Sequence, residues 1–307
     1  MHYTGTIFDM HVHVMDVTRA DEVVQLERDY GYDGFNLLSL EALYPGQNDR
    51  AFALSAETGC TVFAGLNYLS GVPYAEQAQA MLARGAKGYK MIEGKPDVYR
   101  DVRTRLGASP LTSPAMFDFY AVLEKAGATL LLHAGDPPDF WGNAPDWAKY
   151  AGVGYDAPTF PRLKTIRAEV EEIARRFPRL SFILAHFYFI ANDIDEAARM
   201  LERYPAVMFD LCPGVEMYTH FSQEVTAWRT FFIKYSDRLL FGTDNFETDT
   251  DKDRADKDVI NRLMHQFLQT DEAFSAWDLT LRGIDLPVDV LEKIYYKNFM
   301  RLIKRAK

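Results

Sequence analysis

Short apolar runs that are typical of β-strands alternate with helical patterns along most of the chain. Several runs are apolar at every position, such as Leu130–Leu132, as expected of parallel strands that are covered on both faces. The segments between the runs show the spacing of amphipathic helices, and three of them end in a glycine, at Gly59, Gly85 and Gly127. The predicted strands are Thr6–Asp9, Gly34–Ser39, Thr61–Leu66, Ala86–Ile92, Ala128–His133, Ser181–His186, Ala206–Leu211 and Leu239–Asp244.

Eight alternating β/α units in about 250 residues predict the α/β class, and within it a (β/α)8 TIM barrel. The alternative is an open, doubly wound sheet, which would need a glycine-rich phosphate-binding turn after the first strand. The sequence has Met10-His11-Val12-His13 at that point, and this favours the closed barrel. No linker rich in proline, glycine or serine divides the chain, so residues 1–307 are predicted to form a single domain. The last segment, Leu286–Lys307, is predicted to be a helix that packs on the outside of the barrel.

Three connections are longer than a barrel requires, and long loops in a compact domain are usually lids or disordered segments. They follow the fourth, fifth and eighth strands and cover residues 93–112, 134–162 and 245–258. The second contains Trp141 with other aromatic residues and several prolines, which favours an ordered lid. The third is strongly acidic and is predicted to be a solvated surface.

The composition narrows the classes of partner. A formal net charge of −10 argues against nucleic acid, because binding to phosphates needs a basic surface. A small anionic substrate stays compatible with this charge, since one local cation can dominate a pocket. The two cysteines, Cys60 and Cys212, form no disulfide framework and indicate a reducing cytoplasm. No signal peptide or apolar run long enough to cross a membrane is visible, and association into a homo-oligomer is left open.

Four of the seven histidines fall at the ends of predicted strands. His11 and His13 are two residues apart, so their side chains point to the same side of an extended strand. His133, His186 and Asp244 end the fifth, sixth and eighth strands. Because the strand ends of a barrel meet at one mouth, the five side chains are predicted to converge there. Three imidazoles and a carboxylate suit a divalent metal ion, with Zn²⁺ as the default and Mn²⁺, Fe²⁺ or Co²⁺ as alternatives.

The motifs around these residues resemble those of the amidohydrolase superfamily. They are Asp-Met-His-Val-His at 9–13, Leu-Leu-His-Ala-Gly at 131–135, Leu-Ala-His at 184–186 and Phe-Gly-Thr-Asp at 241–244. The resemblance is closest to the amidohydrolase-related branch, which includes aminocarboxymuconate-semialdehyde decarboxylase. It implies one metal ion held by His11, His13, His133 and Asp244. It also implies that Asp244 accepts a proton and that His186 polarises the substrate or acts as acid or base.

Other residues are candidates for contact with the substrate. Two-metal members of the superfamily have a bridging lysine in the fourth strand, where this chain has Lys90. Since the one-metal branch fits better, we interpret Lys90 as a contact for a substrate anion or as a structural residue. Trp141 in the second long loop, and Glu216 and Tyr218 after the seventh strand, are further candidates for the pocket wall.

The same predicted residues are compatible with two different reactions. The favoured hypothesis is a hydrolase that uses a metal-activated water on a small, carboxylate-bearing ester, lactone or amide. The alternative is a carboxy-lyase that removes CO₂ from an unsaturated or aromatic acid. A third class, a binding barrel without turnover, is disfavoured because the predicted metal ligands are all present. Product analysis separates the first two.

Overall fold

The computed structural model describes residues 2–16, 18–96, 111–145, 154–157 and 160–306. Eight parallel strands form one sheet in which each strand is hydrogen-bonded to the next along the chain, from β1 to β8. This order confirms the predicted (β/α)8 barrel. The strands are β1 (Phe8–His13), β2 (Gly34–Leu38), β3 (Thr61–Gly65), β4 (Gly88–Glu93), β5 (Thr129–Ala134), β6 (Ser181–Leu184), β7 (Val207–Asp210) and β8 (Leu239–Leu240).

Backbone contacts just beyond β8 close the barrel onto β1. The amide of His13 donates to the carbonyl of Asn245 at 2.8 Å, and the amide of Asp244 donates to the carbonyl of His11 at 2.8 Å. Val12 and Asn245 form an isolated parallel bridge at the same point. The seam therefore runs directly through the predicted metal ligands.

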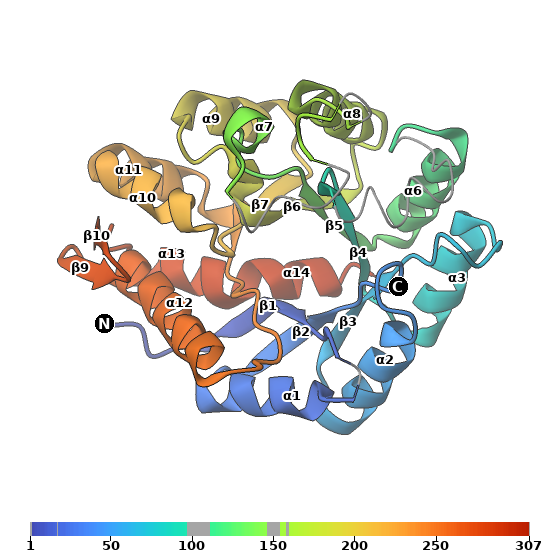
Figure 1. Ribbon diagram of the computed structural model, residues 1–307, viewed down its shortest axis with the longest axis horizontal. Helices are drawn as coiled ribbons and strands as arrows, with labels where there is room; N and C mark the ends of the chain where they lie inside the picture. The colour runs from blue at the N-terminus through green and yellow to red at the C-terminus, as the bar shows by residue number, and fades with distance from the viewer. Residues whose placement is uncertain (1, 17, 97–110, 146–153, 158–159, 307) are drawn as a thin grey trace.

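Helices surround the strands (Figure 1). Gly59, Gly85 and Gly127 end three of them in the left-handed conformation, with φ of 75°, 113° and 69°, as predicted. The helices are α1 (Ala20–Asp29), α2 (Gln47–Thr58), α3 (Tyr74–Arg84), α6 (Pro114–Ala126), α7 (Phe140–Asn143), α8 (Leu163–Arg176), α9 (Ile194–Arg203), α10 (Val215–Gln223), α11 (Val225–Lys234), α12 (Asp251–Gln269), α13 (Val288–Glu292) and α14 (Asn298–Ile303). Short helical turns cover Ala185–Phe189, Ser236–Arg238 and Lys293–Lys297. Within the described chain, no helix has the length and apolar character of a membrane span.

Two predicted strand ends are corrected by the structure. β6 ends at Leu184 and β8 at Leu240, so His186 and Asp244 lie beyond the strands and not in them. Both residues have positive φ, 54° and 60°, in the left-handed region that side chains other than glycine rarely adopt. The backbone turns at both positions.

The C-terminal helix lies in a different place from the one predicted. Phe299 and Leu302 of α14 are buried among residues from the inner side of the barrel, including Met10, Leu131 and Met208. The prediction that this segment packs on the outside is wrong, because its apolar face closes the barrel interior instead. In Figure 1, α13 and α14 run together across the strands.

The long connections are partly ordered. α12 begins at Asp251, so the acidic connection after β8 is shorter than predicted. Helix α12 is followed by a hairpin that the sequence did not indicate, with β9 (Ala273–Ala276) antiparallel to β10 (Leu279–Arg282). In the connection after β5, Tyr155 and Phe160 are buried against Phe140 and Trp141, as an ordered segment requires. Most of the predicted lid after β4 lies outside the described residues.

Replacing Asn298 tests how α14 holds the last strand. Its side-chain amide donates to the carbonyls of Ser236 and Leu239, at 2.7 and 2.8 Å, and the residue is fully buried. Asn298→Leu leaves both carbonyls without this donor, so we expect the free energy of unfolding to fall by about 2–4 kcal/mol. Urea denaturation measures this loss. The adjacent, exposed Lys297→Ala is the control and should change stability by less than about 1 kcal/mol; equal effects of the two variants would contradict the anchoring role.

Candidate metal centre and active site

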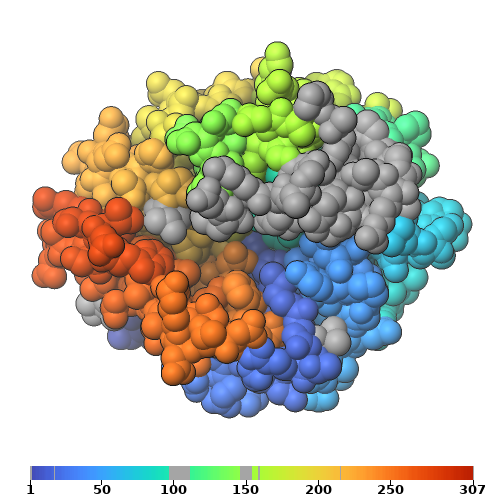
Figure 2. Space-filling model, viewed as in Figure 1, coloured from blue at the N-terminus to red at the C-terminus, as the bar shows by residue number. Residues whose placement is uncertain are grey.

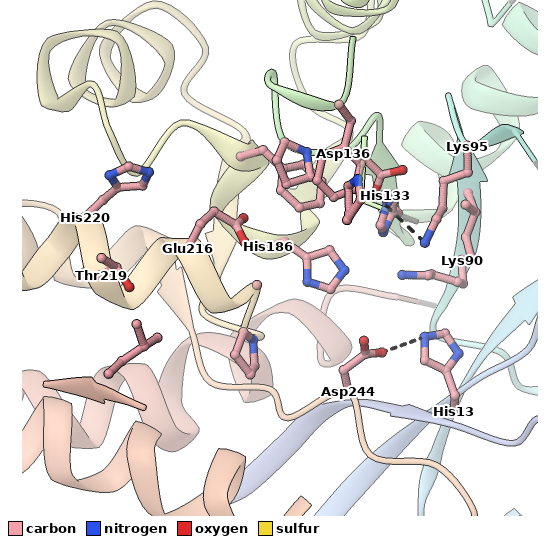
Figure 3. A pocket seen from close by; sticks show the side chains of 18 of the residues that line it. His13, Lys90, Lys95, His133, Asp136, His186, Glu216, Thr219, His220 and Asp244 are labelled. Atoms are coloured by element: carbon pink, nitrogen blue, oxygen red, sulfur yellow. Dashed lines mark ion pairs between the residues drawn. The ribbon is translucent and has the colours of Figure 1, made fainter. Parts of the chain in front are cut away.

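A cavity of about 750 Å³ lies at the carboxyl ends of the strands. Its charged and polar lining includes side chains from β1, β4 and β5, from the loops after β5, β6 and β8, and from α10 (Figure 3). Apolar residues such as Phe140, Phe189 and Leu279 form much of the remaining wall. In the space-filling view, segments coloured from blue to red follow one another around the face seen in Figure 1, as expected for a barrel (Figure 2).

His11, His13 and Asp244 form a close cluster beside the cavity. The Nε2 atoms of His11 and His13 are 3.2 Å apart, because residues two apart in β1 present their side chains to the same side. An oxygen of Asp244 lies 3.2 Å from Nε2 of His13 and 3.5 Å from Nε2 of His11. The buried Lys257 of α12 donates to the Asp244 carbonyl at 2.6 Å and supports its left-handed backbone.

The buried carboxylate of Asp210 contacts two of the histidines, His11 through its ring and His186 through its backbone. One carboxylate oxygen is 2.7 Å from Nδ1 of His11, and the other accepts the backbone N–H of His186 at 2.7 Å. With its Nδ1–H directed at the carboxylate, His11 has its lone pair on Nε2, facing His13 and Asp244. Sequence reasoning missed Asp210, although it lies near the end of the predicted seventh strand. Applying the strand-end rule to carboxylates as well as to histidines would have found it.

The electrostatics of the cluster favour neutral imidazoles and a charged carboxylate. Burial lowers the pKa of His11 well below its usual value, and the nearby Lys90 charge lowers it further. Burial also lowers the pKa of His13. For Asp244, burial alone would raise the pKa, but the hydrogen bond with His13 and the surrounding histidines hold it well below its usual value. Metal ligands need these protonation states.

The positions of the three donor atoms fit a divalent metal ion. Ligands at 2.0–2.1 Å in a tetrahedral zinc site lie roughly 3.3 Å from one another. The separations of 3.2, 3.2 and 3.5 Å among His11, His13 and Asp244 match this value. Nε2 of His11 offers its lone pair towards His13 and Asp244, and a cation between the three atoms would accept it. His11, His13 and Asp244 could therefore hold the ion.

His133 and His186 occupy the adjoining part of the cavity. Their ring centres are 4.8 Å apart, and Nε2 of His133, which has no hydrogen-bond partner among the described residues, is 3.4 Å from Asp136. In the described chain, the groups close enough to share an ion are His11–His13–Asp244 and His11–His186–Cys212. His133 belongs to neither group, so its role as a ligand stays a prediction.

His186 has a defined tautomer. Its Nδ1 lies 3.2 Å from the carbonyl of Cys212, so Nδ1 must be the protonated nitrogen and Nε2 the acceptor. Burial lowers the pKa of His186 to about 3, and this keeps the ring neutral. As it stands, His186 can accept a proton or a hydrogen bond at Nε2.

The other predicted contacts divide into two pairs. Lys90 and Glu216 line the cavity, whereas Tyr218 and Trp141 do not lie among its lining residues. Tyr218 is buried in the core, where its hydroxyl donates to the Leu211 carbonyl. Glu216 and Tyr218 are two residues apart in α10, so they point to different sides of the helix.

Trp141 is also corrected by the structure. It packs against Tyr155 and donates through Nε1 to the Pro161 carbonyl, so it holds its own connection together. Three ionisable residues that the sequence did not single out line the cavity: Lys95, Asp136 and His220. They lie just after β4, just after β5 and in α10, and no spacing within a strand indicates them.

Comparisons with known proteins agree with the fold. The amidohydrolase family profile matches residues 8–305. An uncharacterised TIM-barrel protein from Bordetella bronchiseptica has 15% identity and a TM-score of 0.62, with 98% of this chain and 99% of that chain covered. The 5-carboxyvanillate decarboxylase LigW from Sphingomonas paucimobilis has 12% identity and a TM-score of 0.57, with coverages of 98% and 99%. At these identities the two structures show a shared fold alone. No match was found among curated proteins.

Replacing Asp210 tests the orientation of His11. In Asp210→Asn, the carboxylate that fixes the His11 tautomer is lost while the size of the side chain is kept. We expect the affinity for Zn²⁺ to fall roughly tenfold to a hundredfold, as for other residues that orient a metal ligand. Competition with a chelator measures this affinity. Asp118→Asn, at an exposed position of α6, is the matched control; an unchanged affinity in the Asp210 variant would remove the orienting role.

Proposed function

The chain belongs to the amidohydrolase family, and we propose that it is a metal-dependent hydrolase of a small, carboxylate-bearing ester, lactone or amide. Members of this superfamily are metal-dependent enzymes. The observation that carries the proposal is the contact of the Asp244 carboxylate with His11 and His13 at the cavity. It puts a charged base beside the position where a cation fits.

The residues have separate roles in this proposal. His11, His13, His133 and Asp244 would hold one divalent ion, most simply Zn²⁺, with Mn²⁺, Fe²⁺ or Co²⁺ as alternatives. Such an ion supplies Lewis-acid chemistry, since it polarises a substrate oxygen and makes water more acidic. Asp244 accepts the proton of the attacking water at its carboxylate and returns it to the leaving oxygen or nitrogen. Nε2 of His186 accepts a hydrogen bond from the reacting group and keeps it in line.

Lys90 and Lys95 support the choice of an acidic substrate. Both lysines line the cavity on the side of β4 (Figure 3). An ammonium group in a pocket with largely apolar walls attracts a substrate carboxylate more strongly than it would in open solvent. The proposal therefore places the carboxylate of the substrate towards Lys90 and its reacting bond towards Asp244.

A carboxy-lyase is the second candidate, and one observation favours it. Phe140, Phe189 and Leu279 give the cavity apolar walls suited to a flat aromatic or unsaturated acid. In that reaction the carbon–carboxylate bond breaks and a proton replaces CO₂ at the carbon. LigW is named a decarboxylase, but its fold serves unrelated reactions and so decides nothing.

The setting of the enzyme is part of the proposal. We infer a reducing cytoplasm, because Cys60 and Cys212 are both buried and unpaired. The expected partner is a small molecule, with no nucleic acid and no membrane; self-association is left open by the described surface.

Asp244→Asn tests the catalytic base. The amide cannot take the proton of the attacking water, so we expect kcat to fall roughly 10²- to 10⁴-fold. Metal content is measured on the same sample, which separates loss of the base from loss of the ion. Asp251→Asn, at an exposed position of α12, should leave kcat unchanged; full activity in the Asp244 variant would refute the assignment.

Product analysis decides between the two reactions. The Zn²⁺-loaded protein is incubated with a panel of carboxylate-bearing lactones, esters and amides, and with unsaturated and aromatic acids. Ring opening or acid release without CO₂ supports the hydrolase. CO₂ evolution without hydrolysis of any panel member would replace it by the carboxy-lyase.

A further inference from the structure

Helix α10 presents one face to the cavity. Glu216, Thr219 and His220 line it together, because residues three and four apart lie on the same side of a helix. Figure 3 shows Glu216 and His220 on one side of His186, with Lys90 and Lys95 on the other. The mechanism proposed above uses none of the α10 residues, so this wall has no assigned role.

One carboxylate oxygen of Glu216 lacks a hydrogen-bond donor among the described residues. Its Oε1 is shielded from solvent and has no hydrogen-bond partner among the described residues. No lysine or arginine in the described part of the chain forms an ion pair with it, whereas Asp136 on the same cavity has Lys95 at 3.9 Å. Burial raises the pKa of Glu216 and the Asp136 charge raises it further, while a hydrogen bond from its own backbone N–H lowers it. The carboxyl group lies in surroundings that lack a cation.

Gly214 makes room for this carboxyl group at the cavity. A Cβ atom at position 214 would lie 2.6 Å from Oε1 of Glu216, too close for two unbonded atoms. The absence of a side chain at Gly214 thus allows Glu216 to occupy its present position. Substitution at this glycine offers a second way to displace the carboxyl group.

We propose that Glu216 binds an ammonium group at the end of the substrate remote from the reacting bond. The substrate class is then a small acid or acyl compound with an amine at its far end. A cation is favoured over a neutral hydroxyl because Glu216 and Asp136 face the same cavity and both attract positive charge. The position of the reacting end rests on the proposed function, whereas binding of the amine rests on Glu216 and its neighbours in the cavity wall.

Binding of paired probes tests this assignment without requiring turnover. The probes are unbranched ω-amino acids from 3-aminopropanoate to 8-aminooctanoate, each paired with the unsubstituted acid of the same length. Calorimetry on the Zn²⁺-loaded protein measures each Kd. At the length that spans the cavity, we expect the amino acid to bind roughly tenfold to a hundredfold more tightly than its partner, the range for a charge-assisted hydrogen bond.

Three variants attribute this preference to Glu216. In Glu216→Gln and Gly214→Ala the ratio of the paired Kd values should fall to within about threefold, because the charge is removed or displaced. Glu224→Gln, at an exposed position just after α10, should keep the wild-type ratio. Affinity for the unsubstituted acids is the internal reference for correct folding.

The outcomes separate this inference from the proposed hydrolysis. A preference for the amino acid at no length, or one that survives in both Glu216→Gln and Gly214→Ala, overturns the role of Glu216. Amine binding in a protein that hydrolyses nothing would retain the Glu216 site and reject the hydrolase. Hydrolysis without any amine preference would retain the hydrolase and reject the Glu216 site.

Discussion

Closure of the barrel between β1 and the residues after β8 is the constraint on which the site depends. Two backbone hydrogen bonds, from Asp244 to His11 and from His13 to Asn245, bring the first and last strands together. The same bonds set the metal-ligand geometry, because they fix the carboxylate of Asp244 beside two imidazoles more than 200 positions away in sequence. Buried polar groups reinforce the seam: Thr243 donates to Asp9, and Asn245 donates to Glu27 at 2.7 Å. A fold that left this seam open would have no site.

On the inner face of a strand, one residue packs in the barrel interior and the residue two positions later reaches the site. Leu131 and His133 share the inner face of β5, and Met208 and Asp210 share that of β7. The apolar member of each pair packs in the barrel interior, which α14 closes, while the polar member reaches the cavity or its floor. Packing of the apolar residue therefore fixes the position of the polar residue two positions later in the same strand.

Two features of this arrangement can be predicted from the sequence: the strands and helices, from the spacing of apolar residues, and the polar side chains at the strand ends. Eight apolar runs, glycine-ended helices and four strand-end histidines sufficed for the barrel and for the histidines that meet at its mouth. The sequence does not reveal which surface an apolar helix face covers, so α14 was predicted outside although Phe299 and Leu302 lie within. The left-handed backbone of His186 and Asp244 is equally invisible, since nothing in their residue type requires it. Tyr218 was assigned to the cavity from loop position alone, and only the helical phase of α10 turns it away.

Lys90 shows how the site's charges constrain one another. Its Nζ lies 3.1 Å from Nε2 of His11, the nitrogen whose lone pair also faces the predicted ion. A protonated Lys90 in this position and a divalent cation therefore compete for the same lone pair. Burial lowers the pKa of Lys90 to about 8, so releasing the proton near neutral pH requires little free energy. In its ammonium form Lys90 lines the cavity, where it can meet a substrate anion. The proposed metal ligand His11 and the proposed contact with a substrate carboxylate therefore depend on the same side chain.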